Sequence, residues 1–176
     1  MKKLSIIASF LIVTTGWLAV AEPNKTQPQS HSAEFEKMKS LVGTWKGKAD
    51  MGGGEQEFTV EYQLVSGGSV VVERQFAGTP KEMVTMYHDR KGKLAMTHYC
   101  TLGNQPGMAL KSADAKTLKF DFDPTCGVDA KKDMHMHSLA LTFVDADNIT
   151  QEWALFQDGK SAGDKHPLIT LKRVKA

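Results

Sequence analysis

The clearest pattern in the chain is a period of two over residues 55–64, with an apolar side chain at every second position from Phe58 onwards. Alternate side chains of a β-strand point to opposite faces, so this alternation predicts a strand with one buried face. That face carries Gln56, Phe58, Val60, Tyr62 and Leu64. Further β-rich runs, separated by turns rich in Gly, Asp and Pro, span residues 69–76, 83–88, 93–100, 108–111, 117–122, 134–144, 149–156 and 166–174.

These runs predict an all-β fold. From Thr44 onwards, about ten short strands follow one another, mostly through tight turns and with no helical period between them. An antiparallel meander of this size can close into a barrel, which removes both exposed edges and leaves room for a small ligand. The expected fold is therefore an antiparallel meander closed into a barrel of about ten strands. A two-sheet sandwich is the alternative.

A short helix is expected just before the first strand. Over residues 33–42 the apolar side chains recur at helical spacing, Ser32 is a suitable N-cap, and Gly43 is a common helix-end signal. Trp45 follows at once, in the sequence Gly43-Thr44-Trp45-Lys46-Gly47, on a strand whose other positions are polar or small. We expect the helix to plug one end of the barrel with Trp45 packed beneath it. The alternative is an ordinary core tryptophan at a helix–strand junction.

Alternating strand directions sort the histidines and cysteines between the two ends of such a barrel. If the Trp45 end is the bottom, His88 and Arg173 also fall at the bottom. The side chains expected at the top are His98, Cys100, Cys126, His135, His137 and His166. No local motif shows this grouping, which depends on the meander.

The N-terminal 21 residues have the pattern of a secretory signal peptide. Two lysines precede an apolar run over residues 4–18, and Ala19-Val20-Ala21 forms an A-x-A cleavage site. The run is too short for a comfortable membrane span, so we expect a periplasmic or secreted protein with no stable membrane span after cleavage. The expected division of the chain is 1–21 as signal peptide, 22–31 as a flexible polar leader and 32–176 as the barrel domain.

The charge balance argues against a nucleic-acid partner. The chain has 22 Lys+Arg and 20 Asp+Glu, and removal of the signal takes away only Lys2 and Lys3. The remaining chain has no basic excess and no cluster of basic residues among aromatic ones, which are the marks of nucleic-acid binding. The oligomeric state is left open by the sequence.

The helix leading into Gly43-Thr44-Trp45-Lys46-Gly47, the meander and a final apolar strand ending in Arg173 resemble the calycin superfamily. That group includes lipocalins, fatty-acid-binding proteins and nitrobindin-like barrels. The hairpin over residues 86–106 also looks like uncharacterised secreted bacterial domains of this type. The resemblance implies that Trp45 packs under Arg173 at the closed end. Nitrobindin-like proteins carry heme on a histidine, but their Gly-rich extension ending in Tyr-Pro is replaced here by Lys48-Ala49-Asp50-Met51.

Three histidines are candidate ligand or metal contacts. His135 and His137 are two residues apart, so both should point to the face that continues as Leu139 and Leu141, and two such histidines can bind one metal ion. They can equally line a wet barrel mouth as hydrogen-bonding groups. His98 shares its face with Leu94, Met96 and Cys100, where ligand recognition, metal ligation and axial heme contact compete with a hydrogen-bonded core histidine.

The remaining candidates are methionines, cysteines and one arginine. Asp133-Met134-His135-Met136-His137 is suggestive of Cu(I), although methionine is also ordinary cavity lining. Cys100 and Cys126, the two cysteines of the chain, are expected to form a disulfide in an oxidising compartment, and a thiolate metal site is the rival. Arg74 could meet an acidic ligand group if it pointed inward, but its strand is too uniformly apolar to assign a side.

The leading hypothesis is an exported barrel that binds a small, largely apolar molecule without turnover, with His98, His135, His137, Met96 and Arg74 as ligand contacts. The second is a metal- or heme-binding protein using His98, His135 and His137. The third is an enzyme acting on a small molecule with His98 as acid or base. The sequence has no Gly-x-Ser-x-Gly elbow, no His-Glu-x-x-His and no phosphate loop, so no catalytic residues are assigned.

Overall fold

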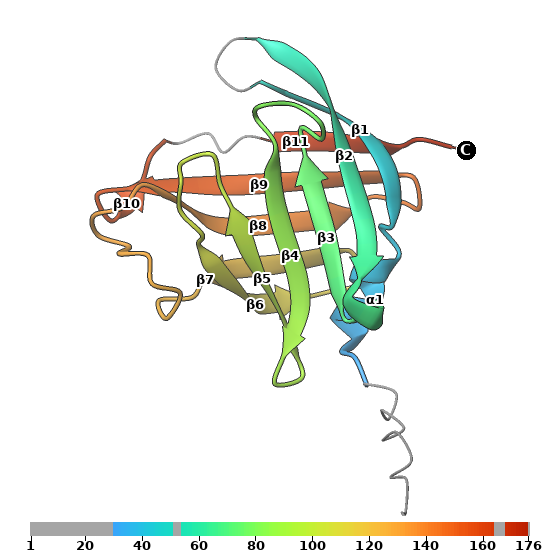
Figure 1. Ribbon diagram of the computed structural model, residues 1–176, viewed down its shortest axis with the longest axis horizontal. Helices are drawn as coiled ribbons and strands as arrows, with labels where there is room; N and C mark the ends of the chain where they lie inside the picture. The colour runs from blue at the N-terminus through green and yellow to red at the C-terminus, as the bar shows by residue number, and fades with distance from the viewer. Residues whose placement is uncertain (1–29, 51–53, 164–167, 176) are drawn as a thin grey trace, which may run out of the picture.

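The computed structural model describes residues 30–50, 54–163 and 168–175, and the expected signal peptide and His166 lie outside this part. The chain folds into a closed antiparallel barrel of ten strands, with a short helix near one end and one further strand outside (Figure 1). The elements are α1 (Ala33–Lys39), β1 (Gly43–Asp50), β2 (Glu55–Val65), the 3-10 turn η1 (Ser66–Gly68), β3 (Val70–Gln75), β4 (Met83–Arg90), β5 (Lys93–Tyr99), β6 (Gly107–Ala113), β7 (Thr117–Phe122), β8 (His135–Phe143), β9 (Asn148–Gln157), β10 (Lys160–Ser161) and β11 (Leu168–Arg173).

The order of pairing closes the sheet on itself. Neighbours in the barrel follow the chain from β1 to β9, β11 then pairs with β9, and β1 pairs with β11. The two-residue strand β10 pairs with β9 outside the closed ring. The expected all-β barrel of about ten strands is confirmed, and the sandwich alternative is wrong because the β8–β9 pairing leaves one continuous closed sheet.

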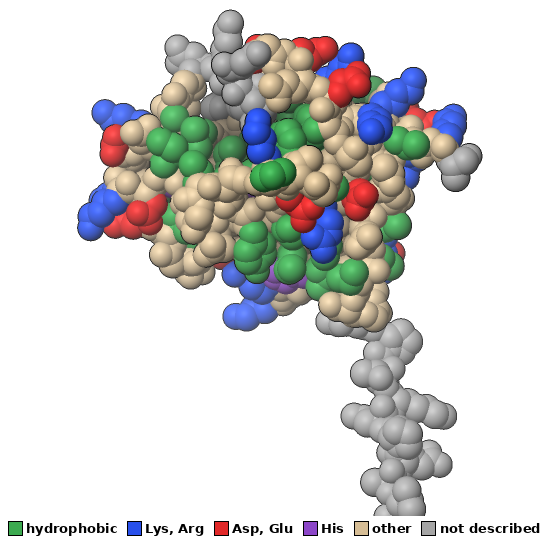
Figure 2. Space-filling model, turned by 45° about the horizontal axis from the view of Figure 1, so that its top comes forward, with side chains coloured by type: hydrophobic (Ala, Val, Ile, Leu, Met, Phe, Trp, Pro, Cys, Tyr) green, Lys and Arg blue, Asp and Glu red, His purple; other side chains and the backbone are tan. Residues whose placement is uncertain are grey.

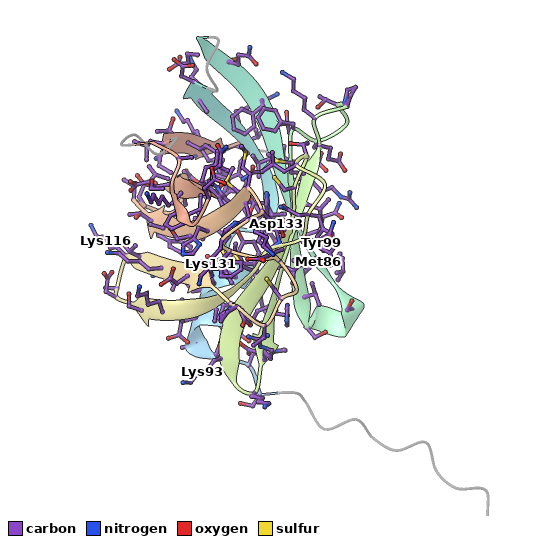
Figure 3. The ribbon with its side chains drawn as sticks, turned by 90° about the vertical axis from the view of Figure 1, so that its left-hand side faces the viewer. Met86, Lys93, Tyr99, Lys116, Lys131 and Asp133 are labelled. Atoms are coloured by element: carbon purple, nitrogen blue, oxygen red, sulfur yellow. The ribbon has the colours of Figure 1, made fainter. Side chains whose placement is uncertain are left out.

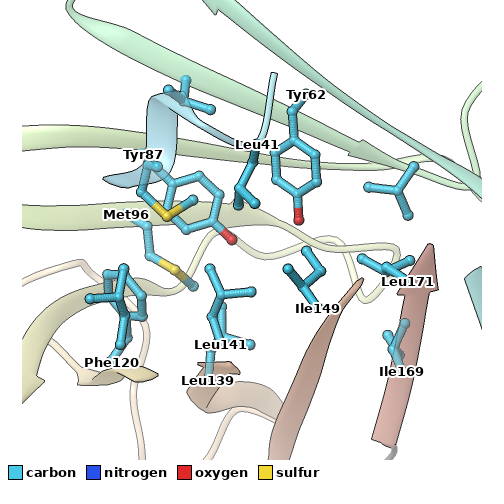
Figure 4. Close-up of a cluster of buried hydrophobic side chains, with 14 of the residues drawn as sticks. Leu41, Tyr62, Tyr87, Met96, Phe120, Leu139, Leu141, Ile149, Ile169 and Leu171 are labelled. Atoms are coloured by element: carbon cyan, nitrogen blue, oxygen red, sulfur yellow. The ribbon is translucent and has the colours of Figure 1, made fainter. Parts of the chain in front are cut away.

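The alternation that predicted β2 is seen in its burial. Phe58, Val60 and Tyr62 are buried, whereas Gln56 and Leu64, which share their face, are exposed toward the two ends of the strand. Such inward side chains from every long strand form the apolar core of the barrel. Figure 4 shows Tyr62 and Tyr87 among them, with their hydroxyl groups directed into the interior between aliphatic side chains.

The helix and the first strand build the closed end. Ser32 caps α1, its Oγ accepting a hydrogen bond from the Phe35 amide at 3.1 Å. Phe35, Met38 and Leu41 are at most 1% exposed, so their apolar side chains form the plug. Val42 continues the same apolar pattern in the sequence but is 41% exposed and does not join the plug.

Trp45 and Arg173 lock this end together. Trp45 is completely buried, and its indole Nε1 donates a hydrogen bond to the Leu41 carbonyl at 2.8 Å. The Arg173 guanidinium lies 4.3 Å from the Trp45 ring centroid and donates to the carbonyls of Val42 and Ser40 at 2.9 and 2.7 Å. The last strand of the barrel is thus tied to the loop that follows the helix.

Every strand pairing in the barrel is antiparallel, so strand direction alternates around it. β1 leaves the helix end at Gly43, so β5 runs away from that end and finishes, near His98, at the opposite end. β8 starts at this opposite end with His135. His88 lies toward the helix end of β4, as the meander predicts. Among the described residues, no helix is long and apolar enough to cross a membrane.

Candidate functional site

A row of polar side chains crosses the inner face of four neighbouring strands. Tyr62 on β2 lies opposite Glu73 on β3, Glu73 lies opposite Thr85 on β4, and Thr85 lies opposite His98 on β5. All four are at most 1% exposed. Side chains directly opposite each other in an antiparallel sheet have Cβ atoms about 5 Å apart, so the row is continuous. Four adjoining polar groups in a barrel interior are unusual because each must find a hydrogen-bond partner.

Most of the row is satisfied by a network centred on Glu73. One carboxylate oxygen, Oε1, accepts hydrogen bonds from the side-chain amides of Gln75 and Gln151, both at 2.8 Å. The other, Oε2, accepts from the Tyr87 hydroxyl at 2.7 Å. Gln151 also donates to the Tyr62 hydroxyl at 2.7 Å, which links β9 to β2 across the interior.

The network continues from Gln151 to the aromatic ring beside His98. The side-chain oxygen of Gln151, Oε1, accepts hydrogen bonds from the Gln75 side-chain amide at 2.7 Å and from the Trp153 indole at 3.0 Å. The Trp153 ring packs against His98, with ring centroids 4.7 Å apart. These hydrogen bonds and the ring contact join eight residues into a continuous cluster across the barrel interior, which we call the interior belt. Its members are Tyr62, Glu73, Gln75, Thr85, Tyr87, His98, Gln151 and Trp153.

Burial shifts the acidity of the belt. It raises the pKa of the Glu73 carboxyl, and the hydrogen bonds from Gln151, Tyr87 and Gln75 oppose that shift only in part. Burial, followed by the negative charge of Glu73, raises the pKa of the Tyr62 and Tyr87 hydroxyls well above their usual value. The two tyrosines therefore remain protonated donors at neutral pH.

His98 has one ring nitrogen bonded and one without a partner. Its Nδ1 is 2.8 Å from the Thr85 hydroxyl, but its Nε2 is buried and has no hydrogen-bond partner among the described residues. Burial lowers the pKa of His98 to about 4, so the imidazole is neutral at physiological pH. An unpartnered buried polar atom costs about 1–3 kcal/mol, which makes Nε2 the natural place for a ligand atom or a buried water.

A pair of histidines, His135 and His137, lies at the end of the barrel opposite the helix. His135 Nδ1 is 2.7 Å from the Asp133 carbonyl, which can only accept, so this nitrogen carries the proton. If both rings are neutral, His137 Nδ1, which lies 3.0 Å from His135 Nε2, is the donor between them. His137 Nε2, 3.8 Å from a carboxylate oxygen of Asp121, then carries a lone pair.

Two phenylalanines hold the rim histidines in place. The His137 ring stacks on Phe156, with centroids 3.7 Å apart and planes 8° apart, and it also stacks on Phe122 at 5.2 Å. His135 is completely buried beneath them and contacts the same two rings. The register between β8 and β9 is irregular between Met136 and Ser138, at the position of His137. Burial, followed by the charge of His135, lowers the pKa of His137.

The structure places the other predicted site residues differently. Met96 is buried in the core next to the belt, on the face expected for it. Arg74 lies on the outer face, where it forms an ion pair with Glu82 at 2.9 Å, so it does not reach the interior. This corrects the suggestion that it meets a ligand. The inward side chain at this point of β3 is its neighbour Glu73.

The two cysteines are half-buried free thiols in this structure. Cys100 packs against the core, whereas Cys126 covers Gly107 on the outer face. The expected disulfide thus stays a prediction, which chemical analysis of the exported protein must test. In the described part of the chain, no group of three or more His, Cys, Asp or Glu side chains is arranged to hold a metal ion.

The outer surface has a mixed character. Figure 2 shows positive and negative side chains dispersed over the face in view, with small apolar patches between them. Met86 and Tyr99, which are 37% and 42% exposed, belong to the outer side of the β4–β5 pair (Figure 3). The surface hollows found in the described part are lined mainly by outward side chains, and one runs along His88, Thr97 and Gly107.

Comparisons with known proteins leave the family open. No family model matches the chain, and no curated protein matches it. Among solved structures, a redesigned β-barrel aligns with 78% of this chain and 95% of its own length, at 13% identity and a TM-score of 0.36. A likeness at that level carries no argument about function. The calycin resemblance of the Trp45 motif therefore stays an expectation.

Proposed function

We propose that this protein is an exported barrel that binds a small, largely apolar molecule in its interior without chemically converting it. The observation that supports this most directly is the buried, unpartnered Nε2 of His98 inside the barrel. Binding sites of this kind are mostly apolar with a few polar groups that fix the ligand's orientation. Closed barrels of eight or more strands can hold one small ligand in their interior.

The end of the barrel opposite the helix is the proposed entrance for the ligand. The helix, Trp45 and Arg173 close the other end, while His135 and His137 lie at the rim near the start of β8. A ligand that entered there would pass the stacked histidines and Phe122 before reaching His98 and Met96. His135, His137, Met96 and His98 are accordingly the proposed ligand contacts.

The first experiment is a binding assay on protein purified after export. N-phenylnaphthylamine is an uncharged molecule whose fluorescence rises on transfer from water to an apolar site. We expect saturable binding to the native protein. Histidine signals followed by NMR during the titration should shift for His98, His135 and His137 and stay unchanged for His88, which faces outward on β4. A shift confined to His88 would refute the proposed site.

The same preparation separates the two alternatives. A bound metal ion or heme would appear in metal analysis or in the absorbance spectrum, and its loss on changing His98, His135 or His137 would favour the second function. Of the atoms of this histidine pair, His137 Nε2, which lies beside Asp121, is the one best placed to bind a metal ion. Turnover of a bound molecule that is lost in His98→Phe would favour an enzyme.

A further inference from the structure

The chemistry of the interior belt also constrains the polar end of the ligand. This inference rests on the proposed function and refines it. His98 is only 1% exposed, and its Nε2 has no hydrogen-bond partner among the described residues. Its Nδ1 is hydrogen-bonded to the Thr85 hydroxyl. The ligand group that reaches this atom must bind a neutral imidazole in a site where no water-exposed surface helps to solvate a charge.

The surrounding charges disfavour a carboxylate. None of the lysines and arginines in the described part of the chain is buried. Arg74 pairs with Glu82 outside the barrel, Arg90 pairs with Asp123, and Arg173 lies on the Trp45 ring at the closed end. An acidic ligand bound at His98 would therefore be a buried charge without a cation, which is strongly unfavourable.

The nearest ionisable group makes an acid still less suitable and gives little help to an amine. Glu73 is two positions from His98 along the interior row, with Thr85 between them. Its carboxylate oxygens already accept three hydrogen bonds, from Gln75, Gln151 and Tyr87, out of about four that a carboxylate can accept. A second negative charge in the same interior would be repelled, and an ammonium group at His98 would find only one free acceptor.

A hydroxyl group fits His98 in either arrangement of its proton. The Thr85 hydroxyl can donate to Nδ1 or accept from it, so Nε2 is either a donor or an acceptor. An alcohol can complement both, whereas a carboxylate can only accept and an ammonium can only donate. We infer that the barrel takes an uncharged apolar alcohol or phenol whose hydroxyl group hydrogen-bonds to His98 Nε2, in preference to a fatty acid or an amine of the same length.

The test compares three probes that differ only in their polar end: decanol, decanoate and decylamine. Each displaces N-phenylnaphthylamine from the native full-length protein recovered after export, at neutral pH. We expect decanol to bind at least tenfold more tightly than either charged probe. In His98→Phe, decanol affinity should fall by roughly tenfold, the upper range for one lost hydrogen bond, while the charged probes change little.

Two further variants make the result specific. His88→Phe makes the same substitution on the outer face of β4 and should leave all three affinities unchanged. His98→Gln, which keeps a polar group at the site, should restore part of the decanol affinity if His98→Phe folds poorly by circular dichroism. Glu73→Gln should narrow the gap between decanol and decanoate, because it removes the like charge.

The outcomes separate the inference from the function beneath it. If decanoate or decylamine binds as tightly as decanol, the inference is wrong although the barrel still binds apolar molecules. If decanol affinity is the same in His98→Phe as in the native protein, Nε2 serves a buried water and the inference is again wrong. If the fluorescent probe and all three decyl compounds fail to bind, the proposed function itself is refuted.

Discussion

The buried imidazole of His98 should make the folded protein sensitive to acid. The pKa of His98 is about 4 in the folded state, against 6.5 for the free side chain. Between these values the unfolded chain binds a proton that the folded chain does not, so stability falls as the pH is lowered from 6.5 to 4 and levels off below. At about 1.4 kcal/mol for each pH interval of one, the loss attributable to His98 is about 3 kcal/mol.

The measurement is the free energy of unfolding by urea at several pH values, for the native protein and for His98→Phe. From pH 7 to pH 4, the free energy of unfolding should fall by about 3 kcal/mol more in the native protein than in His98→Phe. Glu73 acts in the opposite direction, because burial raises its pKa and the folded state then gains protons in acid. Glu73 is present in both proteins, so the difference isolates His98, and His88→Phe serves as the control.

A difference that stays constant from pH 7 to pH 4 would refute this reasoning. It would mean that the His98 ring is hydrated or can take up a proton in the folded barrel. The unpartnered Nε2 would then face water, and both the proposed ligand contact and the preference for an alcohol would lose their structural basis. Repeating the comparison with Glu73→Gln in both proteins would show whether the two groups titrate independently.

Three other predictions follow from the closed end, the strand contacts and the thiols. Trp45→Ala should lower the free energy of unfolding by about 3–5 kcal/mol, and Arg173→Ala by about 1 kcal/mol, in urea titrations. Gly47→Ala should cost about 1–3 kcal/mol, because its methyl group would lie 2.7 Å from a leucine methyl on β11; an unchanged midpoint would contradict the packing. Non-reducing mass analysis of the exported protein should show Cys100 joined to Cys126; two titratable thiols would contradict that expectation.

Much of the fold could be predicted from the sequence because its signals are local. The period-two pattern of β2, the turn residues and the helix-end signal at Gly43 each report on their own segment. Strand direction then followed from counting strands, and it placed His88 and His98 at opposite ends. The closing pairs between β1 and β11 could be expected from the general tendency of such meanders to remove their edges, and from the resemblance that placed Trp45 under Arg173.

The interior belt could not be predicted in the same way. On β3 the consecutive valines at 70–72 hide the alternation that identifies an inner face, so either Glu73 or Arg74 could have pointed inward. One signal was present on β9, where Gln151 alternates with Ile149 and Trp153 on a clearly apolar face. A glutamine in such a position indicates a buried polar group with a partner elsewhere in the fold.

The bulge in β8 was also beyond sequence reasoning. His135 and His137 were expected to share a face by simple alternation with Leu139, and they do meet in one cluster. The strand register is nevertheless irregular between Met136 and Ser138, at the position of His137. The tautomer chain from Asp133 through the two rings depends on that local geometry and on the carbonyl of Asp133, which no residue pattern specifies.

The closure of the barrel has a consequence for how the chain folds. The barrel closes by pairing of β1 with β11, which places Trp45 opposite Arg173. These two residues are separated by nearly the whole sequence of the domain. Proteins dominated by such distant pairings fold slowly, on timescales of roughly milliseconds to seconds. The helix, β1 and the central hairpins can form early, but Arg173 can pack on the Trp45 ring only after β11 has paired with β1. Substitution of Arg173 should therefore speed unfolding more than it slows folding.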